Sequence, residues 1–306
     1  MELGIKKTNR EKKSIVYLIS TFAIVLWGMS YIWIDRLINA GIPVFYFVFI
    51  RILLAGLVLL LFNFATGKLV RIQKQDIPKF ILLAFFEPFI YFMTESYGIK
   101  ETGSPTLSAM LIATIPIFSV VAGRVLFNEK INWINAVGIL LSMAGICLVV
   151  MSKDTVGPNF IWGIALLLIA VISEVGHASV TKKLACRYDS QVIVMYQFLI
   201  GSVYFLPFFL RYGLADFQPY YLDIEIWIPI LCLAILCSSV AFSLWVTTIK
   251  SLGVSKSSIF TALIPVAAAI VAWVLGHELL CARQWSGIAI STVGVIMSQY
   301  VIRKRR

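Results

Sequence analysis

Five ionisable side chains lie inside otherwise apolar stretches of this sequence: Arg51, Glu87, Glu95, Glu174 and His177. A charge in an apolar environment is costly, and it usually faces a partner or a water-filled path. Glu174 and His177 are three residues apart, so they share one face of a helix and can exchange a proton. This pair, with Glu95 as the alternative proton carrier, predicts ion coupling or acid–base chemistry. For Arg51 and Glu87 we favour a structural role, in which Arg51 pairs with Glu87 or Glu95.

Aromatic and hydroxyl side chains lie close to these ionisable residues along the chain. Trp27 and Trp245 lie well inside apolar stretches or beside polar residues. We expect them to line a cavity, whereas tryptophans near the ends of such stretches usually lie at the membrane–water interface. The candidates for the wall of a central cavity are Trp27, Ser30, Tyr31, Tyr91, Thr94, Glu95, Glu174, His177, Trp245 and Thr248. An amphipathic cavity with few charges suits a zwitterion or a small apolar metabolite.

The sequence predicts no cofactor or metal site, and we assign no catalytic residue. The five cysteines form no CxxC pair. His277 and Glu278 resemble the start of a zinc protease motif, but Cys281 stands where the motif requires a second histidine. The alternative from a different functional class is an intramembrane enzyme that uses Glu174 and His177 as acid and base.

The elements that must position these side chains are membrane-spanning helices. Apolar residues make up 60% of the chain and charged residues 13%, against roughly 45–50% and about 25% in soluble domains. A helix of about 20 apolar residues is long enough to cross a bilayer. Ten such stretches predict an all-α integral membrane protein with helices at 15–34, 44–64, 79–98, 104–126, 132–151, 159–181, 191–210, 226–249, 256–276 and 283–302. We expect the first stretch to be retained, because it is longer than the apolar part of a signal peptide.

Lysine and arginine residues are concentrated on alternate loops of this ten-helix arrangement. Twenty of them fall on the side of the amino terminus and five on the opposite side, while Arg51 lies inside a span. Because cytoplasmic loops hold the excess of positive residues, we expect both termini in the cytoplasm and the protein in the plasma (inner) membrane of a bacterium. The net charge of +11 follows from this topology, so we expect a small-molecule substrate and the lipid bilayer as partners, and no nucleic acid.

The two halves of the chain repeat. A shift of 149 residues aligns ten identical residues over positions 113–145, among them Ala113, Ile115 and Pro116 with Ala262, Ile264 and Pro265. Each half holds five spans, an odd number, so the second copy must enter the membrane from the other side. We therefore expect two inverted repeats, as in secondary transporters whose substrate site lies between the halves. The predicted segments are a basic amino terminus (1–14), a first repeat (15–151), a second repeat (159–302) and a basic tail (303–306).

Several motifs resemble those of a known family. Pro116 followed by Leu126-Phe127-Asn128-Glu129 resembles the second part of an EamA-type repeat, and Pro265 followed by Leu275-Gly276-His277-Glu278 resembles it again. Trp27-Gly28 and Arg51 are similar to the opening of that repeat, whereas the second copy has Ser173-Glu174 and Gln197 near those positions. This resemblance to the drug/metabolite transporter superfamily covers nearly the whole chain. It implies a ten-helix fold that moves small metabolites, often amino acids.

Small residues recur on one helical face near the end of each repeat, at Gly138, Ser142 and Gly145 and again at Gly287, Ser291 and Gly294. Small side chains let helices approach closely within a membrane. We expect these faces to pack within one protomer, with a homodimer interface as the alternative. Structural roles are accordingly assigned to Gly145, Gly294, Pro116 and Pro265, beside Arg51.

The sequence as a whole predicts a secondary transporter and not an enzyme. The expected substrate is a small amino-acid-like or amphipathic metabolite, moved by alternating access, with export as the favoured direction. A facilitative uniporter without ion coupling is the alternative within the same class.

Overall fold

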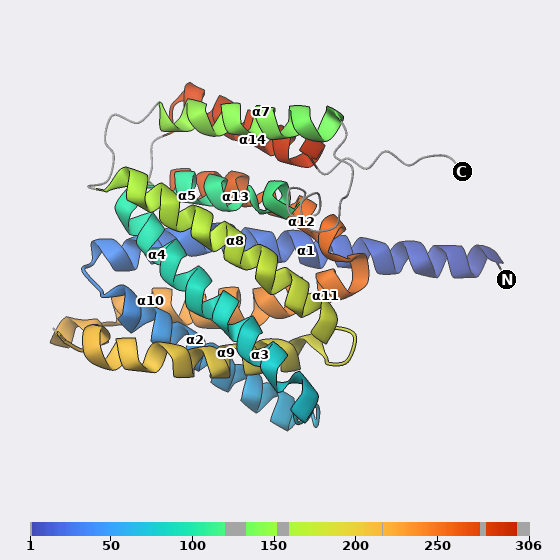
Figure 1. The fold of residues 1–306 in the computed structure, drawn as a ribbon, viewed down its shortest axis with the longest axis vertical. Coiled ribbons are helices and arrows are strands. Elements are labelled where there is room, and N and C mark those ends of the chain that lie inside the picture. The colour runs from blue at the N-terminus through green and yellow to red at the C-terminus, as the bar shows by residue number, and fades with distance from the viewer. Residues whose placement is uncertain (1, 120–132, 152–158, 216, 276–279, 299–306) are drawn as a thin grey trace.

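The computed structural model describes residues 2–119, 133–151, 159–215, 217–275 and 280–298, and all regular structure in these ranges is helical (Figure 1). Seven helical segments are long and apolar enough to cross a membrane: Ser14–Asn39, Val44–Ala65, Lys74–Thr102, Trp133–Val150, Phe160–Leu184, Ser190–Gly213 and Ile224–Leu252. Two shorter apolar segments, Pro105–Ser119 and Ile264–Val274, accompany them. The protein is therefore a multi-pass helical membrane protein. The glutamates of the two EamA-like motifs, Glu129 and Glu278, lie outside the described residues.

The helices of the first half are α1 (Glu2–Asn39), α2 (Val44–Ala65), α3 (Ile77–Ala84), α4 (Tyr91–Thr102), α5 (Pro105–Ile112) and α7 (Trp133–Val150). Those of the second half are α8 (Phe160–Leu184), α9 (Ser190–Phe208), α10 (Ile224–Leu231), α11 (Phe242–Leu252), α12 (Val254–Thr261), α13 (Ile264–Val274) and α14 (Ala282–Ser298). Wider π-helical turns join α3 to α4 at Phe85–Ile90 and α10 to α11 at Cys232–Ala241, so each of these two spans has an irregular middle.

Two of the predicted helices, 104–126 and 256–276, are each interrupted by a two-residue turn within their described parts. The α5 helix ends at Ile112 and the α12 helix ends at Thr261, and after a two-residue turn the chain is helical again from Ile115 and Ile264, one residue before the prolines. Ile112 and Thr261 stand four residues before Pro116 and Pro265. A proline has no N–H to bond the carbonyl four residues earlier, and its ring crowds that carbonyl. The same proline therefore interrupts the same span of both halves.

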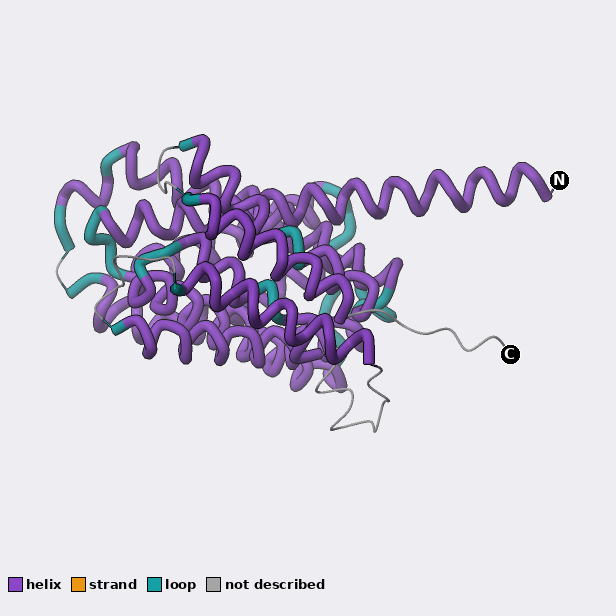
Figure 2. The backbone as a smooth tube through the Cα atoms, turned by 90° about the horizontal axis from the view of Figure 1, so that it is seen from above, coloured by secondary structure: helices purple, strands orange, loops and turns teal. Residues whose placement is uncertain are grey.

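The helices lie in stacked layers. In Figure 1, α7 and α14 form an outer pair, α5, α12 and α13 lie beneath them, α1, α4, α8 and α11 occupy the middle, and α2 and α9 lie on the far side. Figure 2 shows the amino-terminal part of α1 projecting beyond the bundle. The buried apolar side chains form one core that draws on both halves of the chain. The middle layers are therefore covered on both sides by helices.

The α7 and α14 helices pack through their small residues. A side chain added at Gly145 would meet the backbone of Gly287 and Ser291, and one added at Gly138 would meet the backbone of Gly294. The later residue of α7 therefore contacts the earlier residue of α14, so the two helices run antiparallel. At the centre of the contact, the hydroxyl oxygens of Ser142 and Ser291 lie 3.2 Å apart. These small faces therefore pack within one chain.

Candidate functional site

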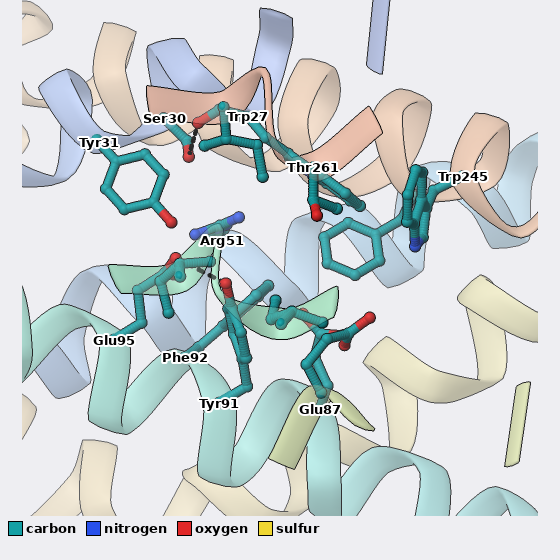
Figure 3. A pocket seen from close by; sticks show the side chains of 15 residues that line it. Trp27, Ser30, Tyr31, Arg51, Glu87, Tyr91, Phe92, Glu95, Trp245 and Thr261 are labelled. Atoms are coloured by element: carbon teal, nitrogen blue, oxygen red, sulfur yellow. Dashed lines mark hydrogen bonds between the residues drawn. The ribbon is translucent and has the colours of Figure 1, made fainter. Parts of the chain in front are cut away.

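A cavity of about 40 Å³ lies in the middle layers of the bundle, enclosed by residues of both halves (Figure 3). Its wall consists of Trp27, Ser30, Tyr31, Arg51, Glu87, Tyr91, Phe92, Glu95, Ile112, Ile115, Glu174, Phe242, Trp245, Thr261 and Ile264. At about 10–15 Å³ for each enclosed water, the cavity has room for about three water molecules. The space between the helices is thus small, and its wall is polar and aromatic.

Equivalent positions of the two halves contribute to this wall. Ile112 and Ile115 of the first half correspond to Thr261 and Ile264 of the second half at the shift of 149 residues, and all four line the cavity. They flank the two proline-dependent interruptions. Before this region the two halves align at a shift of 150 residues, as Ile99 and Ile249 show. At that shift Phe92 corresponds to Phe242 and Glu95 to Trp245, and these four residues also line the cavity. The cavity therefore lies between the two halves.

Glu87 reaches the cavity because the helix is broken at this residue. Its backbone is extended, with φ −144° and ψ 122°, inside the π-helical turn between α3 and α4. The Ser173 hydroxyl donates a hydrogen bond of 2.7 Å to the carbonyl of Phe86, which satisfies a backbone group beside the break. Gly201 of α9 leaves space for the Pro88 ring on the other side. Both neighbouring helices thus accommodate the irregular backbone.

Glu87, Glu174 and His177 form a buried acid–base cluster. The His177 Nδ1 lies 2.9 Å from Glu174 Oε2 and 3.0 Å from Glu87 Oε2, and the His177 side chain is fully buried. One imidazole nitrogen therefore faces two carboxylates, so a proton can be held at this point by any of three groups. One ligand atom from each residue lies within 4.8 Å of the other two, so the cluster could also hold a metal ion.

The second imidazole nitrogen of His177 contacts two further polar side chains. Its Nε2 lies 3.3 Å from the Gln197 Oε1 and 3.3 Å from the Thr181 hydroxyl. Gln197 offers an acceptor in this orientation and Thr181 can act as donor or acceptor, so Nε2 can be satisfied with or without a proton. Both imidazole nitrogens of His177 therefore have polar partners.

Arg51 does not form the ion pair predicted from the sequence. Among the described residues, no carboxylate oxygen lies within 4.0 Å of its guanidinium nitrogens. Its Nε donates a hydrogen bond of 2.7 Å to the Ser238 hydroxyl, and its guanidinium carbon lies 4.1 Å from the centre of the Phe92 ring. The buried Nη1 has no hydrogen-bond partner among the described residues. The expected partners are occupied elsewhere, because Glu87 contacts His177 and Glu95 accepts a hydrogen bond of 3.1 Å from the Tyr91 hydroxyl.

Aromatic rings form much of the remaining wall. The Trp27 ring lies 5.0 Å from Phe242 and 5.2 Å from Trp245, both in edge-to-face arrangements. The Trp27 Nε1 donates a hydrogen bond of 3.3 Å to the carbonyl of Cys237, inside the second π-helical turn. In Figure 3 the Tyr31 and Tyr91 hydroxyls and the Glu95 carboxylate gather around Arg51, on the side of the cavity away from Trp245. The site thus has a polar end at Arg51 and an aromatic end at Trp245.

The structure gathers seven of the ten predicted cavity residues around this cavity: Trp27, Ser30, Tyr31, Tyr91, Glu95, Glu174 and Trp245. The other three do not line it. His177 lies behind Glu174, Thr94 donates to the carbonyl of Ile90, and the Thr248 hydroxyl contacts Leu244 and Ser20. Arg51 and Glu87, predicted to be structural, are part of the wall.

Sequence reasoning missed Phe92, Phe242, Thr261 and the three isoleucines of the wall. The repeat carries a signal that could have identified most of them. Once Trp245 and Glu95 are recognised as equivalent positions, the neighbouring pair Phe92 and Phe242 follows at the same shift. The isoleucines and Thr261 stand beside the prolines that the repeat aligns.

A second, smaller cavity of about 20 Å³ adjoins the first. Glu174, Trp245, Thr261 and Ile115 line both, so they form the partition between the two. The smaller cavity continues along α8 to Ala178, towards the end of the helix that carries Lys182 and Lys183. Glu174 therefore stands at the point where the two spaces meet.

Comparison with known proteins agrees with this architecture. The model of the EamA-like transporter family matches residues 14–151 and again residues 161–300. The chain is 28% identical over 304 residues to the uncharacterized transporter YetK of Bacillus subtilis, covering 97% of this chain and 89% of that one. It is 25% identical over 230 residues to a "Probable terminal-alkyne amino-acid exporter" of Streptantibioticus cattleyicolor, covering 74% of each chain. A crystal structure of another protein shares the fold with a TM-score of 0.70 at 17% identity, covering 93% of this chain and 96% of that one.

Proposed function

The chain belongs to the EamA-like transporter family, and on that premise we propose that it is a secondary transporter of a small amphipathic zwitterion of the amino-acid type. Transport proceeds by alternating access, in the direction of export. The similarity to a protein named as an amino-acid exporter supports both the substrate class and the direction.

One observation carries this proposal: the interior cavity draws equivalent residues from both halves of the chain. A substrate site between two repeats is exposed to either side of the membrane when the halves rock against each other. A cavity of about 40 Å³ is too small for a metabolite, so loading requires the walls to move apart. The interruptions after Ile112 and Thr261 and the two π-helical turns give the lining helices places at which to bend.

We propose ten spanning segments arranged as two inverted repeats of five. The family model matches twice, once in each half, which supports the duplication. The antiparallel packing of α7 and α14 through equivalent small residues supports the inversion, because a two-fold axis across the two helices exchanges Gly138 with Gly287 and Gly145 with Gly294. Shorter helices complete the ten spans: α5 forms one, α12 and α13 together form a second, and α14 forms a third. The distribution of lysine and arginine supports cytoplasmic termini in a bacterial plasma membrane.

We propose that a proton is the coupling ion and that Glu174 and His177 carry it. Glu174 is the member of the acid–base cluster at the junction of the two cavities, and His177 contacts it directly. Glu95 is the alternative carrier, held by the Tyr91 hydroxyl on the far side of Arg51.

Flux through proteoliposomes tests the proposed function. We expect purified protein to catalyse counterflow of at least one apolar amino acid from a panel of the twenty proteinogenic amino acids. A pH gradient should drive net movement of the same compound. Liposomes without protein serve as the inactive control. Absence of counterflow for the whole panel would contradict the proposed substrate class.

A further inference from the structure

Arg51 is a buried cation without a countercharge in contact. Its side chain is 2% exposed and lines the cavity between the two halves. Burying an unpaired charge costs several kcal/mol, so a guanidinium in such a place normally has a carboxylate or another anion against it. Here Nε donates a hydrogen bond to the Ser238 hydroxyl, and the Phe92 ring packs against one face of the guanidinium. Nη1 has no hydrogen-bond partner among the described residues.

We propose that Arg51 binds the carboxylate of the transported substrate, an inference that rests on the proposed function and names the group that the site recognises. The guanidinium is planar and presents its donors as a fork that matches the two oxygens of a carboxylate. Ser238 fixes one edge of the group and Phe92 fixes its plane. The edge that carries Nη1 is thus held ready for an anion.

The charges around the cavity favour a carboxylate monoanion over a more highly charged anion. Three carboxylates, those of Glu87, Glu95 and Glu174, line the same wall. A dianion such as a phosphate monoester would meet one guanidinium and three acidic groups, whereas a carboxylate is neutralised by Arg51 alone. The same acidic groups and the aromatic faces of Trp27 and Trp245 suit an ammonium group, which completes a zwitterion.

The alternative is that Arg51 only holds the helices together. Its bond to Ser238 joins α2 to the second π-helical turn and would serve that purpose. A purely structural contact, however, would be expected to pair the remaining donors, as buried polar groups in native structures generally are. The unpaired Nη1 favours substrate binding, because the helix contact through Ser238 leaves this donor without a partner among the described residues.

Matched ligands test the proposal without any substitution. The purified full-length protein is titrated with L-leucine, L-phenylalanine and L-methionine and with the amines that lack their carboxylates, isoamylamine, phenethylamine and 3-(methylthio)propylamine, while binding is measured by calorimetry. We expect at least one amino acid to bind at least about tenfold more tightly than its amine, because losing one partner of a buried charge pair has an effect of that size or larger. The proposal is overturned if every amine binds as tightly as its amino acid, or if none of the three amino acids binds.

Substitution then assigns the preference to Arg51. In Arg51→Gln the ratio of amine to amino-acid dissociation constants should fall to about one, and in Arg51→Lys, which keeps the charge but loses the planar fork, it should fall less. Arg36→Gln removes an exposed arginine of α1 and should leave the ratio unchanged. If Arg51→Gln does not fold, Arg51→Lys and the ligand pairs still decide the matter. A folded Arg51→Gln that keeps the wild-type ratio contradicts the proposal.

Flux separates this proposal from the proposed function. If the protein catalyses amino-acid counterflow but binds the amines equally well, the proposed function holds and the role proposed for Arg51 is wrong. Arg51-dependent carboxylate binding without any flux would keep the role of Arg51 and remove transport.

Discussion

Ser142 and Ser291 touch through their hydroxyl oxygens, 3.2 Å apart, and they are equivalent positions of the two repeats. A residue can contact its own equivalent only on the axis that relates the two copies. The neighbouring glycines agree, since Gly138 faces Gly294 and Gly145 faces Gly287. Since α7 and α14 run antiparallel, that axis crosses the two helices, which is the orientation that the proposed inverted repeats require.

Two native cysteines can report the proposed topology. Cys186 follows α8 and Cys281 precedes α14, and both side chains are exposed. In variants that keep one cysteine each, a membrane-impermeant maleimide should label Cys281 on intact cells and Cys186 only after permeabilisation. The predicted outer loop at 152–158 lies outside the described residues, and a cysteine introduced there should behave like Cys281. Reversed accessibility at both native sites would contradict the topology.

Gly145→Leu or Gly294→Leu should destabilise the fold. A side chain at Gly145 meets the backbone of Gly287 and Ser291, which cannot turn aside as a flexible side chain can. Overpacking of this kind costs about 1–3 kcal/mol, so we expect a lower melting temperature in detergent and reduced expression. Met143→Leu on the exposed side of α7 is the matched control and should behave like the wild type. Unchanged stability of both glycine variants would mean that these faces do not pack closely.

Glu174→Gln should abolish flux driven by a pH gradient and leave counterflow largely intact, because the amide keeps the size of the side chain but cannot release a proton. Glu95→Gln and Glu87→Gln belong in the same assay, and exposed Glu225→Gln is the control. The assignment moves to Glu95 if that variant alone loses the pH dependence. If none of the three variants changes the pH dependence, the protein is a uniporter whose buried carboxylates are structural.

Pro265→Ala should slow transport without weakening the fold. Alanine restores an N–H that can bond the Thr261 carbonyl, and it favours a continuous helix over an interrupted one by about 3 kcal/mol. We expect the maximal rate of counterflow to fall while substrate affinity stays within about threefold of the wild-type value, a change of less than 1 kcal/mol. Pro219→Ala, in the short helix Pro219–Leu222 between α9 and α10, is the control. A variant with an unchanged rate would show that this interruption takes no part in the movement.

The helical membrane fold, the family and seven of the fifteen residues of the cavity wall follow from the sequence, since apolar length, repeated motifs and intramembrane polar residues are local signals. The exact partners of Arg51 and Glu87 do not. A regular helix places Glu87 and Glu95 about 80° apart, so either could have faced Arg51. The extended backbone at Glu87 breaks that regularity and directs its carboxylate to His177 of α8. Such a contact depends on where two helices cross, which no spacing within one helix reveals.

The bond between Arg51 and Ser238 also bears on how the chain is made. The two residues are 187 positions apart, so Arg51 enters the membrane well before its partner exists. At about 5–20 residues per second, that interval lasts roughly 10–40 s. An arginine at the centre of a helix costs about 2.5–3.5 kcal/mol on insertion, and Phe92 is the earlier of the two groups that can reduce it. A first half made without the second therefore leaves the Nε of Arg51 without the hydroxyl of Ser238.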